Sequence, residues 1–316
     1  MDGADQGVVL VGGEALYDLV LDSTGEIRGH AGGGPFNAAR TVGRLGQPAS
    51  YLGRLSRDRL GRTLAAMLTA DGVTLDAVVD TDDPTTLALA EVDDLGVARY
   101  RFYERGTSAP GLTATDALDA LPAAVAILHV GTLGLTLEPM ASALEAVAAR
   151  LAGSALISVD PNIRPWVMGD EHVYRERLRR VLGHSHVVKV SEEDVDWLSP
   201  GRPAPEAARA LLDDGPGVAL LTRGGDGVLV VTTDEEVSVE APKVEVVDTI
   251  GAGDAFAGGF LAWWRARELG PEALSDLDKV VDATAFGCLV AARTVARAGA
   301  FPPHLHELGT DTKITG

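Results

Sequence analysis

The stretch DTIGAGDAFAGGF, residues 248–260, places small residues directly before a carboxylate. Gly251, Ala252 and Gly253 precede Asp254, and an apolar helical pattern follows. The N–H groups of such a loop, together with the positive end of a helix dipole, attract phosphate. A carboxylate at the same place can orient a hydroxyl group and accept its proton. The loop therefore predicts phosphoryl transfer, with the three small residues as an anion hole and Asp254 as the base.

Asp254 also has a plainer interpretation, because an acid in the first turn of a helix is a common cap. Its position predicts a lowered pKa, since the helix dipole favours the ionised form. A weak base is sufficient for phosphoryl transfer, which depends mostly on positioning and charge neutralisation. The chain contains neither GxxxxGK[ST] nor the HRD and DFG motifs, so the P-loop and protein-kinase solutions are absent.

Composition limits the class of partner. The 316 residues include 46 acidic and 27 basic side chains, which gives a formal net charge of −19. Such a surface repels nucleic acid and anionic membranes, so we expect small-molecule partners. No apolar run approaches the ~20 residues of a membrane helix. The single cysteine excludes an intrachain disulfide, and the N-terminus does not resemble a signal peptide, so we expect a cytoplasmic protein.

Short apolar runs alternate with longer helical patterns along the chain. The predicted strands are 8–11, 125–130, 155–159, 186–190, 218–222 and 227–232. The predicted helices are 36–45, 58–71, 138–151, 171–182, 205–213, 254–268 and 278–295. Continuous apolar strands between helices indicate an α/β fold with a parallel sheet covered on both faces. Such sheets bind ligands beyond the carboxyl ends of their strands.

Three segments complete the expected architecture. Residues 17–30 and 86–104 read as strands joined by polar turns, and the second is a hairpin with residues 93–96 at its tip. Strands that leave a doubly wound core in this way are expected to form a lid over a site. The run KVEVV, residues 243–247, is expected to be a strand that leads into the glycine loop.

Two motifs carry a family resemblance. DTIGAGDAFAGGF resembles the C-terminal signature of the ribokinase-like (PfkB-type) carbohydrate kinases, centred on DTxGAGD. GGGPFNAAR, residues 32–40, resembles the N-terminal signature of the same family. The resemblance covers residues 8–303, and the two signatures stand in the correct order and separation.

The resemblance implies a three-layer α/β/α sandwich with a mostly parallel central sheet and a small β-sheet lid. A single domain is expected over residues 1–303, with the lid formed by about 17–34 and 86–106. Residues 304–316 are expected to be a flexible tail. The lids of this family pair between subunits, and exposed lid edges benefit from covering. We therefore expect a homodimer formed through the lid.

The resemblance assigns the sugar site residue by residue. Asp18, in GEALYD, matches an acid that hydrogen-bonds sugar hydroxyls. Gly33 and Asn37 match sugar-contacting positions of the N-terminal signature. Gly34 stands where ribokinases proper carry lysine, which disfavours ribose. Asp254 matches the catalytic base, with the preceding small residues as the anion hole.

ATP and its metal ions are implied in the same way. Thr222 and Gly224, in LLTRGGDG, resemble the turn that contacts ATP phosphates. Lys189 and Glu192 fall where the family has Asn-x-x-Glu, and lysine at the first position occurs in the fructokinase-like branch. The glutamate organises water around Mg²⁺, a role that either Glu192 or Glu193 could fill.

A monovalent-cation site is also implied. Asp248 and the segment 294–299 resemble the parts of this site, which in the family is built mostly from carbonyl groups. Pro303 stands where some ribokinases have a serine that completes it. Activation by K⁺ is therefore an open expectation.

Two further stretches concern the identity of the sugar. DPNIRPW resembles a motif of fructokinases and 2-keto-3-deoxygluconate kinases, in which an arginine, here Arg164, reaches the substrate. FYERGTSA resembles the FYxxGTA run of bacterial fructokinases, and its Phe102 could cover the sugar face. Sugar-acid kinases carry an arginine at the position of Glu104, and this glutamate would repel a substrate carboxylate. Arg105 should face away from the site on a strand.

The resulting prediction is an ATP-dependent sugar kinase that acts on fructose. The alternatives are a 2-keto-3-deoxygluconate kinase, a ribokinase or a nucleoside kinase. A non-catalytic sensor of sugar or nucleotide on the same fold is the alternative of a different class, and it is disfavoured because every expected reactive position is filled.

Overall fold

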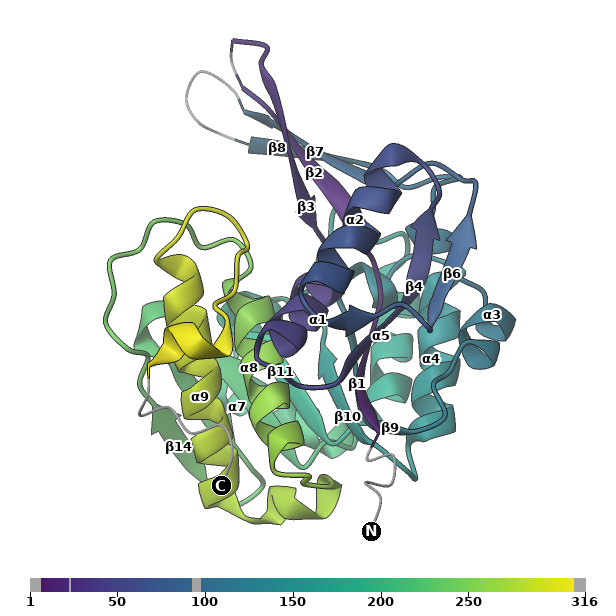
Figure 1. Ribbon diagram of the computed structural model, residues 1–316. Helices are drawn as coiled ribbons and strands as arrows, with labels where there is room; N and C mark the ends of the chain where they lie inside the picture. The colour runs from purple at the N-terminus through teal and green to yellow at the C-terminus, as the bar shows by residue number, and fades with distance from the viewer. Residues whose placement is uncertain (1–6, 23, 93–97, 310–316) are drawn as a thin grey trace.

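A ten-stranded sheet forms the centre of the molecule (Figure 1). The computed structural model describes residues 7–22, 24–92 and 98–309. The strand order is β14-β13-β12-β11-β10-β9-β1-β4-β5, and β6 pairs with β4. The strands are β1 (Val8–Gly12), β4 (Ala49–Ser56), β5 (Val73–Thr74), β6 (Val78–Thr81), β9 (Val125–Gly131), β10 (Leu156–Asp160), β11 (Val187–Ser191), β12 (Val218–Thr222), β13 (Val228–Val231) and β14 (Glu236–Val239). Among the described strands of this sheet, the antiparallel pairings are those of β13 with β12 and with β14, so the predicted mostly parallel sheet is confirmed.

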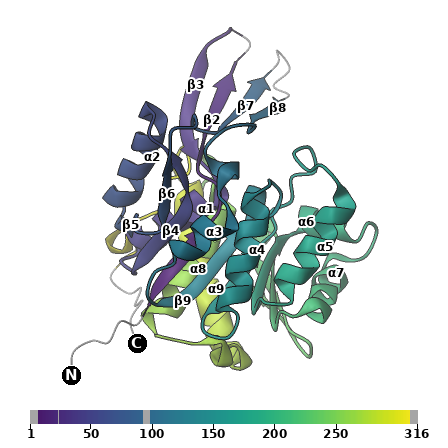
Figure 2. The same ribbon diagram turned by 90° about the vertical axis from the view of Figure 1, so that its right-hand side faces the viewer.

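Helices cover both faces of this sheet (Figures 1 and 2). One face carries α1 (Gly34–Arg44), α2 (Arg59–Ala70), α8 (Ala252–Ala266) and α9 (Leu277–Val295). The other carries α3 (Ala114–Asp119), α4 (Met140–Leu151), α5 (Glu171–Leu182), α6 (Glu192–Leu198) and α7 (Ala204–Ala210). The predicted three-layer α/β/α sandwich is therefore confirmed. Within the described ranges, no helix combines the length and apolar character needed to cross a membrane.

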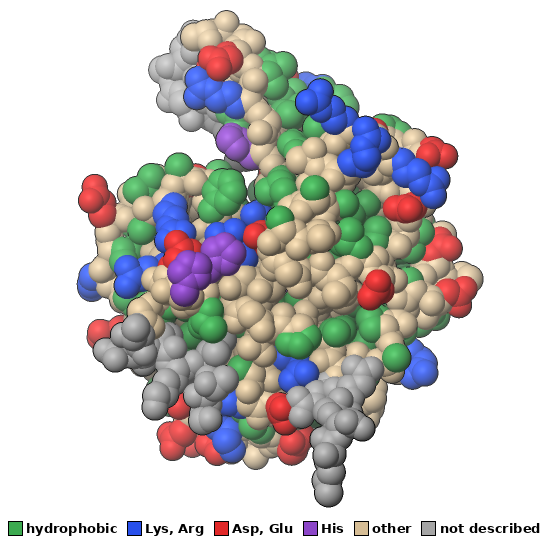
Figure 3. All heavy atoms as spheres, viewed as in Figure 1, with side chains coloured by type: hydrophobic (Ala, Val, Ile, Leu, Met, Phe, Trp, Pro, Cys, Tyr) green, Lys and Arg blue, Asp and Glu red, His purple; other side chains and the backbone are tan. Residues whose placement is uncertain are grey.

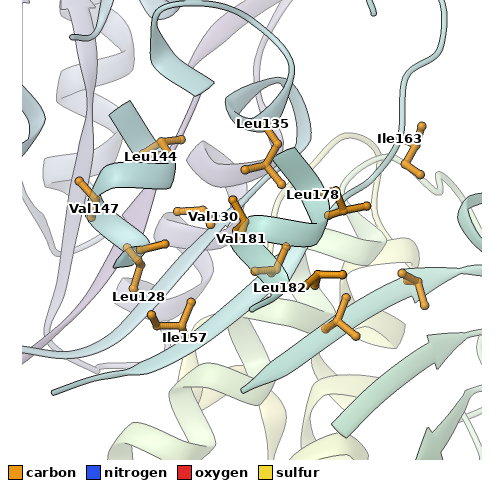
Figure 4. Packing of buried hydrophobic residues seen from close by; sticks show 14 of the residues in the cluster. Leu128, Val130, Leu135, Leu144, Val147, Ile157, Ile163, Leu178, Val181 and Leu182 are labelled. Atoms are coloured by element: carbon orange, nitrogen blue, oxygen red, sulfur yellow. The ribbon is translucent and has the colours of Figure 1, made fainter. Parts of the chain in front are cut away.

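The core consists of two apolar clusters, one on each side of the sheet. Side chains alternate between the faces of a strand, so Val9 and Val11 of β1 join the cluster under α1 and α8, whereas Leu10 joins the other. Figure 4 shows the second cluster, in which Leu144 of α4 and Val181 of α5 pack over the strands. Both faces of the central strands are buried, which explains their continuous apolar sequences.

A separate four-stranded sheet projects from the body (Figure 1). Its order is β3-β2-β7-β8, and its strands are β2 (Leu16–Leu21), β3 (Ile27–Gly32), β7 (Leu87–Val92) and β8 (Ala98–Tyr103). These strands come from the two segments that interrupt the α/β alternation in the sequence. The predicted hairpin tip at residues 93–96 lies outside the described residues.

The run KVEVV does not form a strand, so this prediction was wrong. Residues 240–247 are irregular, and Val246 and Val247 are each 59% exposed. The sheet already ends at β14, and the N–H groups of Val247 and Asp248 both donate to the carbonyl of Val295 instead. A β-branched sequence alone is not sufficient, because strand formation depends on the packing that the folded chain offers.

Part of the predicted flexible tail packs on the domain. Residues Leu305–Leu308 form the 3₁₀ turn η6, Leu308 is buried, and Glu307 forms an ion pair with Arg297 at 2.6 Å. The tail therefore cannot begin at residue 304, because both an apolar and a charged side chain of this turn have partners. Residues 310–316 lie outside the described part of the chain.

Candidate active site

The carboxyl ends of five parallel strands meet at one edge of the central sheet. Glu14 follows β1, Thr132 follows β9, Asp160 ends β10, Lys189 lies near the end of β11, and Thr222 ends β12. Ligands of open α/β sheets bind beyond this edge. Figure 3 shows that the surface is hollowed between the projecting sheet and the body.

The glycine loop forms the N-terminal end of α8. Gly251 is the N-cap residue, with φ of 77°, and no side chain of the described residues caps the helix. The N–H of Ala252 donates to the carbonyl of Thr249 at 3.2 Å, and the N–H of Ala255 donates to the carbonyl of Gly251 at 2.8 Å. The first turn thus begins at an open helix end, which is a ready anion site because of its N–H groups and dipole.

Asp254 lies in this first turn, and its Oδ2 accepts a hydrogen bond from Nδ2 of Asn37 at 2.9 Å. Burial raises the pKa of Asp254 to about 6, and the hydrogen bond from Asn37 opposes this rise. The charge of Asp160 also raises this pKa, whereas Lys189 and Arg164 lower it. The expectation of a lowered pKa was therefore wrong, because desolvation of the carboxylate outweighs the favourable helix end.

A buried ion pair lies beneath the glycine loop. Nζ of Lys189 donates to Oδ2 of Asp160 at 2.7 Å, and the two residues are 6% and 3% exposed. A Cβ atom placed on Gly253 would lie 3.0 Å from this Nζ, so the ammonium group sits directly under the loop. Burial opposes the charge of Lys189, but Asp160 supports it, and the pKa of Lys189 is raised overall. The site thus holds a fixed cation where an anion would bind.

The glycine run before α1 approaches Asp254 from the other side. Gly33 has φ of 110°, which a side chain would strain. A Cβ atom on Gly34 would lie 2.6 Å from Oγ1 of Thr132 and 3.3 Å from Oδ1 of Asp254. These glycines therefore allow the first turn of α1 to lie directly against the base.

Asp18 extends from the projecting sheet over the same glycine run. Its Oδ2 lies only 2.0 Å from the position of a Cβ atom on Gly32. Burial raises the pKa of Asp18 to about 6, and the charge of the neighbouring His30 lowers it. The carboxylate that was predicted to bind sugar therefore lies against Gly32, at the start of the glycine run whose Gly34 adjoins Asp254.

The register of the projecting sheet places Phe102 on the same face as Asp18. Asp18 pairs with Ala88 across β2 and β7, and Ala88 pairs with Phe102 across β7 and β8. Phe102 is half-buried and packs against the apolar cluster that contains Ala88. Glu104 is partly buried beyond the end of β8, whereas the side chain of Arg105 is 97% exposed. The exposure of Arg105 agrees with its expected orientation away from the site.

Arg164 lies on the loop after β10. Its Nη1 donates to the carbonyls of Asn162 at 3.2 Å and Ile163 at 3.1 Å. Its charge acts on Asp254, as noted above, and also on Asp160. Nδ2 of Asn162 donates a long hydrogen bond to Oγ1 of Thr132 at 3.4 Å. Both residues have left-handed backbone conformations, with φ of 38° for Asn162 and 53° for Thr132. Left-handed non-glycine residues concentrate at functional sites.

Thr222, Gly224 and Glu192, which were predicted for ATP and Mg²⁺, lie at the same sheet edge. Thr222 pairs with Ser191 across β12 and β11, and Gly224, with φ of 54°, begins the next turn. Glu192 follows Ser191 as the exposed first residue of α6. This arrangement puts the predicted ATP-contacting turn beside the glutamate predicted for Mg²⁺.

Asp248 joins the two segments predicted for the monovalent cation. Its Oδ1 accepts a hydrogen bond from the N–H of Ile250 at 3.0 Å, and its Oδ2 accepts one from the N–H of Gly299 at 2.8 Å. The loop before α8 and the segment after α9 are therefore held together by one carboxylate.

Sequence reasoning assigned no role to Glu14, Thr132, Asp160 or Asn162, which the structure places at the site. Asp160 and Asn162 fall inside the DPN run, where only the arginine was singled out. The available signal was positional, because each of the four lies at or just after the carboxyl end of a central strand.

A base and a cation at the open end of a helix provide what transfer of a phosphoryl group requires: an oriented hydroxyl and neutralised charge. Fold and site thus define a small-molecule kinase built on an α/β/α sandwich. Residues 7–306 match the model of the pfkB family carbohydrate kinases. The chain belongs to this family, and the resemblance seen in its two signatures is confirmed.

Relatives within the family include several fructokinases. The chain is 36% identical over 259 residues to a fructokinase of Rhizobium leguminosarum bv. trifolii, which covers 81% of the chain and 79% of that protein. It is 33% identical over 301 residues to fructokinase-1 of Oryza sativa subsp. japonica, with 92% of each covered. The Xylella fastidiosa fructokinase with bound ATP superposes with a TM-score of 0.89 at 28% identity, covering 96% of this chain and 97% of that one. A Vibrio cholerae fructokinase in its fructose-, ADP- and calcium-bound form superposes with a TM-score of 0.83 at 25% identity, covering 96% and 98%.

Proposed function

We propose that the protein is an ATP-dependent fructokinase of the cytoplasm. The observation that carries the proposal is Asp254, a carboxylate at the open N-terminal end of α8 that Asn37 holds in place at 2.9 Å. The similarity to fructokinases over most of the chain supports this choice of substrate.

The reaction follows from these positions. The γ-phosphate of ATP binds at the glycine loop, with Gly251 and Gly253 above the ammonium group of Lys189. Ionised Asp254 orients a primary hydroxyl of the sugar and accepts its proton as the new O–P bond forms. The bond from the γ-phosphorus to the bridging oxygen breaks, and ADP leaves with that electron pair. Since the N–H of Ala252 already donates to Thr249, it contributes least to the anion hole.

Mg²⁺ fits the residues at this edge as a phosphate-bound ion. Within the described ranges, no group of three His, Cys, Asp or Glu side chains could hold a metal by itself. Mg²⁺ usually keeps several waters and binds through one or two carboxylates together with substrate phosphates. Exposed Glu192 fits the role of holding such water, and the ion supplies charge neutralisation to the phosphates. Asp248 and Gly299 fit K⁺ in a further loop site.

The sugar would lie between Asp254 and the projecting sheet. We propose that this sheet acts as a lid over the sugar site and that lid and body form a single domain. Asp18 and Asn37 supply hydroxyl acceptors, since Oδ1 of Asn37 is buried without a hydrogen-bond partner in the described structure. Thr132 leaves no space for a lysine at Gly34, which disfavours the ribokinase arrangement. The charge of Glu104 disfavours a substrate that carries a carboxylate. Phe102 would cover the face of the sugar that is turned toward the lid.

A homodimer through the lid is part of the proposal. The register of the strands puts seven apolar side chains on the face of the lid opposite Asp18: Tyr17, Leu19, Leu21, Ile27, Leu87, Leu89 and Tyr103. The same face also carries the ion pair of Glu91 with Arg101. Ile27 is 60% and Tyr103 50% exposed in the single chain. A second lid would cover this face.

The first experiment measures ADP release with MgATP across fructose, ribose, 2-keto-3-deoxygluconate, adenosine and fructose 6-phosphate. Turnover with fructose alone is expected. Turnover with another compound of the panel would support kinase activity and reject fructose as the substrate.

Glu104→Arg tests the charge argument, because it should improve use of the sugar acid. An unchanged preference would remove the reason for excluding that substrate.

The base is tested by Asp254→Asn, which keeps the size of the side chain and removes its charge. We expect a loss in kcat of at least ~10²-fold, as for a positioned general base. ATP binding, followed by calorimetry, should persist because the loop is intact. An Asp254→Asn variant with the wild-type rate would reject Asp254 as the base. If the wild-type protein binds sugar and ATP without turnover, the protein is better described as a sensor.

A further inference from the structure

Glu14 is a buried carboxyl group that neither family signature nor the proposed reaction uses. It follows β1 and is 1% exposed. Its Oε1 accepts a hydrogen bond from the N–H of Gly34 at 3.1 Å, and its Oε2 accepts one from the N–H of Gly134 at 3.2 Å. One side chain thus joins the first turn of α1 to the 3₁₀ turn η2 (Thr132–Leu135).

The first turn of α1 carries groups that lie against Asp254, and Thr132 of η2 lies against the same turn. Gly34 packs between Asp254 and Thr132, and Asn37 donates to Asp254 one turn further along α1. The N-terminal end of α1 has no side-chain cap at Gly33 and no acid in its first turn. Glu14 supplies the missing acceptor from twenty residues earlier in the chain. The placement of Asn37 against the base therefore depends on Glu14.

We propose that Glu14 is a positioning residue of this kinase, which locks α1 and η2 together behind Asp254 and slows the reaction when its own carboxyl group ionises. The inference rests on the proposed function, because it needs Asp254 to be the base. Ionised Glu14 would place a second negative charge behind the point where anionic phosphate must approach.

The charges around Glu14 support this coupling. Burial raises the pKa of Glu14 to about 8, the N–H groups of Gly34 and Gly134 oppose the rise, and the charge of Asp254 adds to it. From β4, Tyr51 donates to the carbonyl of Gly13 at 2.6 Å, and its pKa lies well above the ordinary value because of burial and the charge of Glu14.

The order of ionisation follows from these values. Asp254, with a pKa of about 6, is also faced by Asp160, Lys189 and Arg164. Asp254 therefore ionises first, and Glu14 stays neutral near pH 7. The active form has an ionised base and a neutral Glu14.

The test is the pH profile of kcat with saturating fructose and MgATP. The wild type should give a bell-shaped profile with a basic limb near pH 8, the pKa of Glu14. Glu14→Gln keeps the size of the side chain and cannot ionise, so the basic limb should disappear. At neutral pH its kcat should fall by about 10-fold to 100-fold, because the amide NH₂ faces a backbone N–H that the hydroxyl oxygen of a neutral carboxyl group can accept, and α1 shifts.

Two further variants separate charge from geometry. Glu14→Asp keeps an ionisable carboxyl group but is one methylene shorter, so it cannot reach both N–H groups; it should lower kcat and keep a basic limb. Tyr51→Phe removes the other ionisable group that faces Glu14, and it should leave the basic limb in place. A purely structural role for Glu14 would lower stability in these variants without moving the limb.

Folding is verified by the ATP dissociation constant and the melting temperature of each variant. A folded Glu14→Gln with the wild-type kcat and an unchanged basic limb would overturn the role of Glu14. If Glu14→Gln does not fold, a Glu14→Asp enzyme with the wild-type kcat would overturn it. Wild-type protein that transfers phosphate to no sugar would overturn the proposed function, and this inference with it.

Discussion

The pKa of Asp254 results from two effects of opposite sign, and the folded environment determines which of them is larger. The helix end and the hydrogen bond from Asn37 favour the carboxylate, but removal from water disfavours it more strongly. The result is a base with a pKa of about 6, which is stronger than a free aspartate and still ionised at neutral pH. Such a value suits late acceptance of a hydroxyl proton.

The raised pKa of Asp254 predicts the acid side of the pH profile. The protonated carboxyl cannot accept a proton, so kcat/KM should fall about tenfold per pH unit below the pKa of about 6. Fructose phosphorylation measured in buffers of constant ionic strength would show this limb. Activity that stays constant down to the ordinary pKa of an aspartate would contradict the assigned environment.

Removal of only one partner of the buried ion pair between Lys189 and Asp160 should lower the stability of the fold. Lys189→Met leaves the buried carboxylate of Asp160 uncompensated, so the free energy of unfolding should fall by about 3–5 kcal/mol. The double variant with Asp160→Asn should recover part of this loss, because no unpaired charge remains. Urea unfolding measures both. A double variant less stable than Lys189→Met would contradict this account.

At the scale of elements, the start of α8 depends on the left-handed conformation of Gly251. Its φ is 77°, and a Cβ atom there would lie 2.7 Å from Cβ of Ala300. Left-handed backbone costs an L-residue about 1–2 kcal/mol, and the contact would also displace the loop. Conformation and packing together thus require glycine at this position.

Gly251→Ala should therefore reduce stability and raise the KM for ATP. Gly46→Ala is a matched control, because Gly46 has the same φ of 77° and its Cβ would meet nothing within 4 Å. Both variants should lose stability in thermal unfolding because of the left-handed backbone, with the larger loss in Gly251→Ala because of the contact with Ala300. Only Gly251→Ala should change the KM for ATP. Equal kinetic effects would show that the loop geometry is not what binds ATP.

Sequence patterns located most elements but missed those with mixed composition. The six apolar runs are all strands of the central sheet, because strands buried on both faces must be apolar throughout. β4, with the sequence ASYLGRLS, is equally central but lacks a continuous apolar run. The short helices α3 and α6 were not predicted either, since each has fewer than three turns over which periodicity can appear.

At the scale of the whole molecule, the projecting sheet presents Asp18 and Phe102 on one face and mostly apolar side chains on the other. Ile27→Asp places a charge on this mostly apolar face and should convert a lid-paired dimer into a monomer. Val173→Asp on α5 is the control, since Val173 is 48% exposed but remote from the lid. Light scattering after size-exclusion chromatography distinguishes the species. A monomeric wild type, or an Ile27→Asp dimer, would reject pairing through this face.

The sequence by itself determined the fold class and the family, and it predicted the chemistry of the glycine loop. These depend on local patterns: apolar runs that only a covered parallel sheet can bury, and small residues that only an anion-binding turn requires. The two signatures also brought Asn37 and Asp254, 217 residues apart, into one predicted site.

Only the tertiary structure decided the electrostatics and the supporting contacts. The pKa of Asp254, the pairing of Lys189 with Asp160 and the position of Glu14 depend on which side chains are removed from water together. The same holds for KVEVV, which forms no strand although its sequence favours one, and whose end is held by hydrogen bonds to the carbonyl of Val295. Desolvation and the closeness of distant segments are properties of the packed chain, and no local pattern of residues encodes them.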